Sequence, residues 1–136
     1  MRGVILNIRK AKNEDIIVTV LSNNSVQSYY RFFGARHSIL QIGNFIDFEI
    51  EENNGNFMPK IRKISHIGFP WLFLTNHLLI WQNFIKLFNT HLQETNHVES
   101  FYLNLLLSRA KKWDKQSPKR LAVEGYLKLL EHEGRV

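Results

Sequence analysis

Aromatic and basic side chains alternate in one short stretch of the chain, from Tyr29 to Ser38, and run into a turn of small residues that carries a further base. Arginine and lysine bind phosphates, and base faces stack on aromatic rings, so this composition suits a surface that holds a nucleic-acid strand. A second interpretation places Tyr30 and Phe32 in a hydrophobic core and leaves Arg31 merely solvated. The residues of the stretch leave both interpretations open.

Further cations that could contact phosphates lie in the first loop and on the fifth predicted strand. Tyr29 adds a ring that could stack on a base, which is worth about 1–3 kcal/mol. The predicted nucleic-acid-binding residues are Arg9, Lys10, Lys12, Tyr29, Arg31, Arg36, His37, Lys60 and Arg62. The alternative is an ordinary solvated barrel, because cations this scattered form a patch only if the fold gathers them.

The elements that must position these side chains are five segments with the pattern of strands. The segments are Gly3–Arg9, Asp15–Leu21, Val26–Phe33, Phe45–Glu51 and Phe57–Ile64. Asn and Gly tolerate positive φ, so the run at 53–56 predicts a hairpin turn. The segment 38–42 is predicted to form a single helical turn. Five short strands joined by polar turns are typical of a small barrel such as the OB-fold.

The period of the apolar residues changes to that of a helix near Gly68. The segment 76–92 is apolar around nearly its whole circumference, so other elements must cover it on more than one side. Asn96 with Glu99 resembles a capping pair that opens a second helix. A serine followed by proline at 117–118 opens a third helix, which a glycine ends.

The bulk composition is that of a folded protein with an anionic partner. The 136 residues are 44% hydrophobic and carry a net charge of +6, which favours nucleic acid, an acidic peptide or a membrane surface. The region 67–85 is too polar to span a membrane, and the start lacks the features of a signal peptide. The absence of cysteine excludes disulfides and thiol catalysis and fits the cytoplasm, where we expect the protein. We predict an α+β protein with a five-stranded OB-fold barrel over 1–66 and about three helices over 67–136.

Three motifs resemble those of the RecO family of bacterial recombination mediators, in the same order. They are the turn Gly34-Ala35-Arg36-His37-Ser38, the hydrophobic turn Ile39–Gly43, and the segment Tyr126–Gly134, so the resemblance covers nearly the whole chain. It implies an N-terminal OB-fold and a role in DNA repair by homologous recombination. It further implies binding to single- and double-stranded DNA, strand annealing, and loading of RecA on SSB-coated DNA with RecR as a partner.

A second basic cluster lies in the helical part, at Arg109, Lys111, Lys112, Lys115, Lys119 and Arg120. A basic rim beside an apolar pocket suits a short acidic peptide that ends in an aromatic residue and a free carboxylate. RecO proteins bind such a tail, that of SSB, on their helical domain. The resemblance therefore implies a tail site at Lys111, Lys112, Lys115 and Arg120, while a solvated helix end or more DNA-binding surface are the alternatives.

The sequence predicts no metal and no cofactor. The stripe Asp47, Glu49 and Glu51 is better explained as the solvated face of a strand, which would repel DNA, and the six histidines have no metal-site spacing. Many RecO proteins carry a four-cysteine zinc site in a later segment. This chain has no cysteine, so we expect a short branch of the family or a fragment.

No motif predicts an enzyme, because the chain has no glycine-rich phosphate loop, no nucleophile elbow and no defensible acid–base pair. Two other functions fit the same sequence. A protein–protein adaptor would bind a partner peptide but no oligonucleotide. An RNA-binding OB-fold protein would prefer RNA to DNA of the same sequence through the 2′-hydroxyl.

Overall fold

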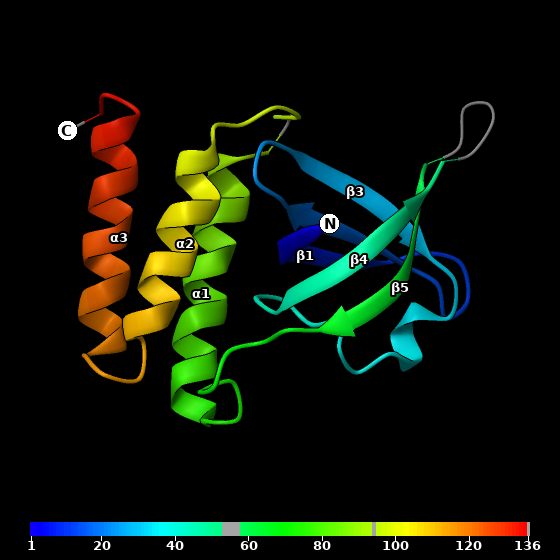
Figure 1. Ribbon diagram of the computed structural model, residues 1–136, viewed down its shortest axis with the longest axis horizontal. Coiled ribbons are helices and arrows are strands. Elements are labelled where there is room, and N and C mark those ends of the chain that lie inside the picture. Colours follow the sequence, from blue (N-terminus) through cyan, green and yellow to red (C-terminus); the bar gives the residue numbers. More distant parts are fainter. Residues whose placement is uncertain (53–57, 94, 136) are drawn as a thin grey trace.

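The computed structural model describes residues 1–52, 58–93 and 95–135, and within them the chain forms five strands followed by three α-helices (Figure 1). The strands are β1 (Arg2–Lys10), β2 (Ile16–Leu21), β3 (Val26–Arg31), β4 (Phe45–Glu51) and β5 (Lys60–His66). The helices are α1 (Thr75–His91), α2 (Ser100–Lys112) and α3 (Pro118–His132). The predicted α+β class is confirmed, whereas the hairpin turn predicted at 53–56 lies outside the described residues.

The five strands close into a barrel in the order β1-β2-β3-β5-β4. Neighbouring strands are antiparallel except β3 and β5, which pair in parallel where Tyr30 lies beside Lys60. Closure removes the exposed edges that a five-stranded sheet would otherwise present. This strand order is that of the OB-fold, so the predicted barrel is confirmed.

A short 3-10 turn, Gly34–Arg36, begins soon after β3 ends. The helical turn predicted at 38–42 is wrong, because that segment forms only non-helical turns. Gly34 is buried, and a Cβ at this position would overlap the side chain of Ile16. The helical turn therefore falls where a glycine lets the chain approach the barrel closely.

Two hydrophobic cores meet at β1, which is buried on both faces. Ile5 points into the barrel, whereas Val4 and Leu6 pack with the helices. The same helix-facing core contains Leu21 and Val26 of the next two strands. The outer face of β1–β3 therefore shares an apolar core with the helices, and α1 and α2 lie nearer the barrel than α3 (Figure 1).

Three buried tryptophans tie the parts together through their indole N–H groups. Trp71 donates to the carbonyl oxygen of Ala110 at 2.8 Å, Trp81 to that of Gly43 at 2.8 Å, and Trp113 to that of His77 at 2.9 Å. Buried polar groups need such partners. Phe69 and Trp71 stack at 5.2 Å, and Phe69 also stacks on Phe45 of β4 at 5.9 Å, so the segment that leads into α1 packs on the barrel.

The helix ends agree only in part with the capping signals. Ser117 Oγ accepts the N–H of Arg120 at 3.5 Å at the start of α3, and Gly134 has a φ of 73° after its end, as predicted. The capping pair predicted for α2 is wrong. Glu99 occupies the cap position without a side-chain hydrogen bond, and the carbonyl of Asn96 accepts the N–H of Val26 at 3.0 Å.

Candidate nucleic-acid interface

Tyr29 was predicted to stack on a base, and the structure shows that this is wrong. It lies opposite Val18 in the β2–β3 register, and both side chains fill the barrel. The residue is 1% exposed, and its ring centroid is 5.8 Å from that of Phe48. Burial raises the pKa of the Tyr29 hydroxyl. Its ring is therefore part of the core and cannot reach a ligand.

Within the stretch 29–38, the exposed aromatic side chains are those of Phe32 and Phe33 instead. They are 50% and 63% exposed, and the Phe32 ring lies edge-on to Tyr30 at 5.1 Å. The alternative that placed Phe32 in the core is also wrong. β3 ends at Arg31, so both phenylalanines lie beyond the strand, where alternation no longer assigns a face.

Outward-facing side chains form a row across four strands at this end of the barrel. The register pairs Arg9 with Ile17, Ile17 with Tyr30, and Tyr30 with Lys60. Lys60 Nζ lies 4.8 Å from the centroid of the Phe32 ring. We call Arg9, Ile17, Tyr30, Phe32 and Lys60 the aromatic row. The fold has thus brought two of the predicted cations, Arg9 and Lys60, to one surface.

Lys10 and Lys12 are exposed where β1 leads into the first loop, next to Arg9. Neither has an ion-pair partner among the residues that the structure describes, so both remain available to phosphates. Arg36 differs, because its guanidinium forms an ion pair with Glu14 and lies 5.6 Å from the Phe33 ring. Its positive charge is partly neutralised before any phosphate arrives.

Asp15 fixes the turn that presents the exposed rings. Its carboxylate accepts the hydroxyl of Tyr30 at 2.5 Å and the backbone N–H of Phe33 at 2.9 Å. These hydrogen bonds lower the pKa of Asp15, the one from Tyr30 most. Phe33 has a φ of 54°, which a bulky residue adopts only where its surroundings impose it. Asp15 is therefore a positioning residue for the aromatic row, and the sequence patterns did not reveal it.

Arg31 and His37 are half-buried and lie close enough for the charge of Arg31 to act on His37. Arg31 donates from a guanidinium nitrogen to the carbonyl oxygen of Ile61 at 3.2 Å. The pKa of His37 is lowered, first by burial and then by the charge of Arg31. Both residues are half-buried, so they are less accessible to a phosphate than Lys10 and Lys12 are.

Arg62 lies two residues beyond Lys60 on the outer face of β5, where the neighbouring strand is β4. It is opposite Glu49 in the β4–β5 register and lies 3.8 Å from the carboxylates of both Glu49 and Glu51. Lys63 pairs with Glu49 as well, at 3.5 Å. The predicted acidic stripe is therefore solvated and partly neutralised by β5. Arg62 is therefore not part of the candidate interface, because DNA beside it would meet the carboxylates of Glu49 and Glu51.

The basic cluster of the helical part divides between two sides of α2. Lys111 and Lys115 border a groove of about 330 Å³ whose apolar lining includes Phe69, Pro70 and Trp71. This groove has the predicted form of a basic rim beside an apolar pocket, although Asp114 also lines it.

Lys112 and Arg120 are not part of that groove. Lys112 lines a separate hollow between α2 and α3 together with Arg109 and Glu131. Arg120 is bound to Glu124 by a hydrogen-bonded ion pair of 2.8 Å, within the same helix. The four residues predicted to bind the SSB tail therefore do not form one site.

The described part of the chain contains no cluster of three or more residues that could hold a metal ion. Among the same residues, no helix is both long and apolar enough to cross a membrane.

The closed barrel and its helical extension define this chain as an OB-fold protein. The family model described as RecO N terminal matches residues 1–72, so the chain belongs to the RecO family. No curated protein matches the sequence. Family membership indicates a role in DNA repair and recombination, with DNA and proteins as partners.

Proposed function

We propose that this protein is a recombination mediator without enzymatic activity. It binds single- and double-stranded DNA, promotes strand annealing, and helps RecA to load on SSB-coated DNA, with RecR as a partner. Membership of the RecO family supports the repair role. The surface of the barrel supports the contact with DNA.

The observation that carries this proposal is the pairing of exposed rings with cations in the aromatic row. Phe32 is half exposed, with Lys60 Nζ 4.8 Å from its centroid and Tyr30 at its edge. A base can stack on such a ring for about 1–3 kcal/mol whatever its identity. Lys60 and Arg9 can neutralise the phosphates on either side. Stacking with backbone neutralisation gives binding that depends on salt and little on sequence.

The charges on the rest of the barrel favour the same path for the strand. Glu51 lies opposite Lys60 and Glu49 opposite Arg62 in the β4–β5 register, so carboxylates would repel phosphates on the β4 side of the row. Arg9, Lys10 and Lys12 lie near the opposite end of the aromatic row from Lys60. A strand that runs along the row therefore meets cations at both ends.

The groove beside α2 supports a second contact, with the acidic tail of SSB. Its apolar lining could take an aromatic side chain, while Lys111 and Lys115 are placed to bind carboxylates. We assign the tail to this groove and not to Lys112 or Arg120, which lie elsewhere. Binding of the SSB tail in this groove would direct the protein to DNA that already carries SSB.

The DNA contact is tested by fluorescence anisotropy of a labelled single-stranded oligonucleotide at several salt concentrations. The double variant Arg9→Glu/Lys60→Glu should bind weakly, and its slope of log K against log salt should be shallower by about 1.4, which is 0.7 for each lost phosphate contact. The matched control Lys119→Glu/Lys128→Glu makes the same charge change at exposed positions of α3 and should bind like the parent.

The rival functions give different results in the same assay. If no oligonucleotide binds even at low salt, the adaptor function replaces the proposal. Tighter binding of RNA than of DNA with the same sequence would indicate the RNA-binding function. Equal loss in both double variants would mean that only total charge matters and that the aromatic row is not the site.

The tail contact is tested with a short acidic peptide that ends in phenylalanine and a free carboxylate. Lys111→Glu/Lys115→Glu should abolish peptide binding and leave DNA affinity unchanged. Lys112→Glu/Arg120→Glu makes the same charge change outside the groove and should retain the peptide. The reverse outcome would move the tail to the hollow between α2 and α3.

A further inference from the structure

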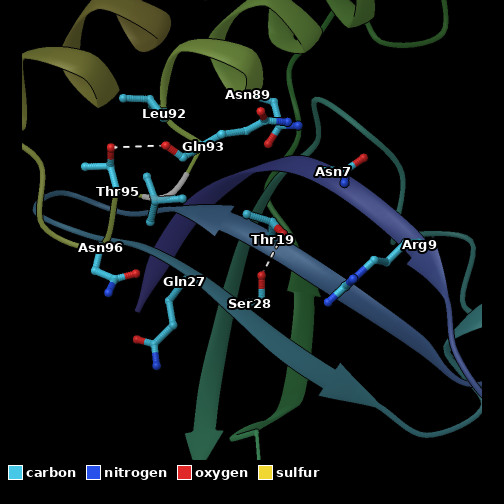
Figure 2. Close-up of a pocket in the computed structure, with 11 residues that line it drawn as sticks. Asn7, Arg9, Thr19, Gln27, Ser28, Asn89, Leu92, Gln93, Thr95 and Asn96 are labelled. Carbon is cyan, nitrogen blue, oxygen red and sulfur yellow. Dashed lines mark hydrogen bonds between the residues drawn. The ribbon is translucent and has the colours of Figure 1, made fainter.

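We propose that the cleft between the outer face of β1–β3 and the end of α1 seats one nucleobase of a bound single strand. This inference rests on the DNA binding proposed above and adds a base-contacting site to it. The cleft measures about 560 Å³, within the range of about 300–1,000 Å³ that is usual for small-ligand sites. Its position is shown in Figure 2.

Polar side chains from two different elements face each other across the cleft. Asn7, Thr19 and Ser28 lie side by side on β1, β2 and β3 and form one wall. Asn89 and Gln93 reach toward them from the end of α1 (Figure 2). Barrel and helix share a packed core, so the two walls are held at a fixed separation.

Local geometry explains why these side chains point into the cleft. The β1–β2 register shifts between Ile5 and Asn7, and this bulge leaves Ile5 in the barrel while Asn7 faces outward beside Thr19. Bulges commonly re-aim a side chain in this way. Asn89 lies on the last turn of α1, and Gln93 follows two residues after the helix ends, where both line the cleft.

The hydrogen-bonding groups in the cleft fit a nucleobase. Thr19 Oγ1 and Ser28 Oγ bond to each other at 2.8 Å. The carboxamides of Asn7, Asn89 and Gln93 have no hydrogen-bond partner within the described residues. A carboxamide offers a donor and an acceptor in one plane, which is the arrangement that pairs with a base edge.

The electrostatics of the cleft favour a base over a phosphate. The last carbonyls of α1 point toward this end of the helix and give it a partial negative charge. Base N–H groups are attracted to that charge, whereas a phosphate is repelled. Among the described residues that line the cleft, Arg9 carries the only formal charge, at the side nearest the aromatic row. A phosphate that follows the seated base would lie beside Arg9.

The cleft is continuous with the aromatic row. Asn7, Thr19 and Ser28 occupy the strand positions two residues away from Arg9, Ile17 and Tyr30 on the same outer face. A strand that leaves Phe32 and follows the row across β3, β2 and β1 therefore reaches the cleft. One base stacks on the Phe32 ring and another enters the cleft. The two contacts therefore define the direction of the bound strand and the number of nucleotides between the two bases.

The test is an abasic scan of a single strand of roughly 8 nucleotides, within the span of about 4–16 that one OB-fold covers. One abasic nucleotide is placed in turn at each position, and affinity is measured by anisotropy. We expect two sensitive positions, one for Phe32 and one for the cleft. Loss of the base in the cleft should weaken binding by about 5- to 150-fold, the effect of one good pairing with a base edge.

Protein variants show which of the two sensitive nucleotide positions contacts the cleft and which contacts Phe32. Asn7→Ala/Asn89→Ala should abolish the penalty at the cleft position and keep the other, whereas Phe32→Ala should do the opposite. Gln93→Ala repeats the test from the segment that follows α1, in case the double variant is unstable. The control Asn83→Ala/Asn104→Ala removes two exposed asparagines from the helices and should leave the profile unchanged.

The inference and the proposed function fail in different ways. A flat profile, or a profile that the cleft variants leave unaltered, overturns the base seat while salt-dependent DNA binding persists. Absence of all binding to the intact strand at low salt overturns the proposed function, and the base seat with it.

Discussion

Tyr29 and Phe32 are close neighbours in the sequence. Alanine at Tyr29 should lower folding stability, whereas alanine at Phe32 should lower DNA affinity. Tyr29 is 1% exposed inside the barrel, and truncation of a buried aromatic ring destabilises a protein by about 3–5 kcal/mol. Phe32 is 50% exposed, so Phe32→Ala should cost less than about 1 kcal/mol of folding stability. Its loss should instead weaken the binding of single-stranded DNA by about 5- to 150-fold, the equivalent of one stacked base at 1–3 kcal/mol.

These energies convert to readily measured changes. A chain of this length loses about 3–5 °C of Tm for each kcal/mol, so Tyr29→Ala should lower Tm by roughly 10–25 °C. Phe32→Ala should lower it by less than about 5 °C. Tyr29→Phe is the matched control, because the Tyr29 hydroxyl only reaches Gln27 Oε1 at 3.5 Å. It should keep both the Tm and the DNA affinity of the parent.

The measurements are thermal unfolding by circular dichroism and anisotropy with one labelled oligonucleotide at low salt. DNA affinity is compared at a temperature where every variant is folded. If Phe32→Ala binds DNA like the parent, no base stacks on the Phe32 ring. If Tyr29→Phe loses affinity at an unchanged Tm, the assignment of Tyr29 to the core is refuted, because Tyr29 would then contact DNA directly.

Three further changes test other parts of the structure. Trp81→Phe leaves the buried carbonyl of Gly43 without its donor and should cost about 1–3 kcal/mol in denaturant unfolding. The pKa of Asp15 is lowered below 3.8, so its stabilising effect is complete above that pH and is lost as the pH falls through the folded value. The NMR shift of the hydrogen-bonded backbone amide should report this step, and Asp15→Asn should remove it. Burial, followed by the hydrogen bond to Glu133, raises the pKa of Tyr102 to about 12, so its contribution is complete below pH 10 and is lost as the pH rises toward 12. Glu133→Gln should lower that pKa in an absorbance titration.

The strands and helices were predictable because their apolar periods differ and are long enough to read. β4 alternates over its whole length. α1 buries Trp81, Phe84, Ile85 and Phe88 at helical spacing. Leu79 and Leu87, which predicted cover on a further side of this helix, are 53% and 45% exposed, so that part of the prediction is wrong. The start of α3 was predictable from Ser117 and Pro118, whose effects are local. The order of the strands could not be read from local patterns, since pairing partners far apart in sequence leave no local signal.

The candidate site was harder to predict because it depends on register. Alternation identifies two faces of β3 but not which one meets the core, and pairing with Val18 decides this for Tyr29. The sequence alone predicts that Arg62 is available for DNA, but the β4–β5 register places it opposite Glu49. Phe32 lies beyond the end of its strand, so no periodic pattern could assign it to the surface.

The shared core determines how the two proposed contacts would cooperate. The aromatic row lies on the barrel and the tail groove beside α2, and the indole of Trp71 lines that groove while donating to Ala110 of α2. Trp81 joins α1 to Gly43 next to β4. Since no flexible linker separates barrel and helices in this packing, a bound tail would hold nearby DNA at one fixed geometry. The gain in effective concentration would then be lost if the tail and the DNA cannot reach both surfaces together. A single-stranded DNA joined to the peptide through linkers of increasing length should therefore show a sharp affinity maximum at one length, whereas two loosely connected domains would give a broad one.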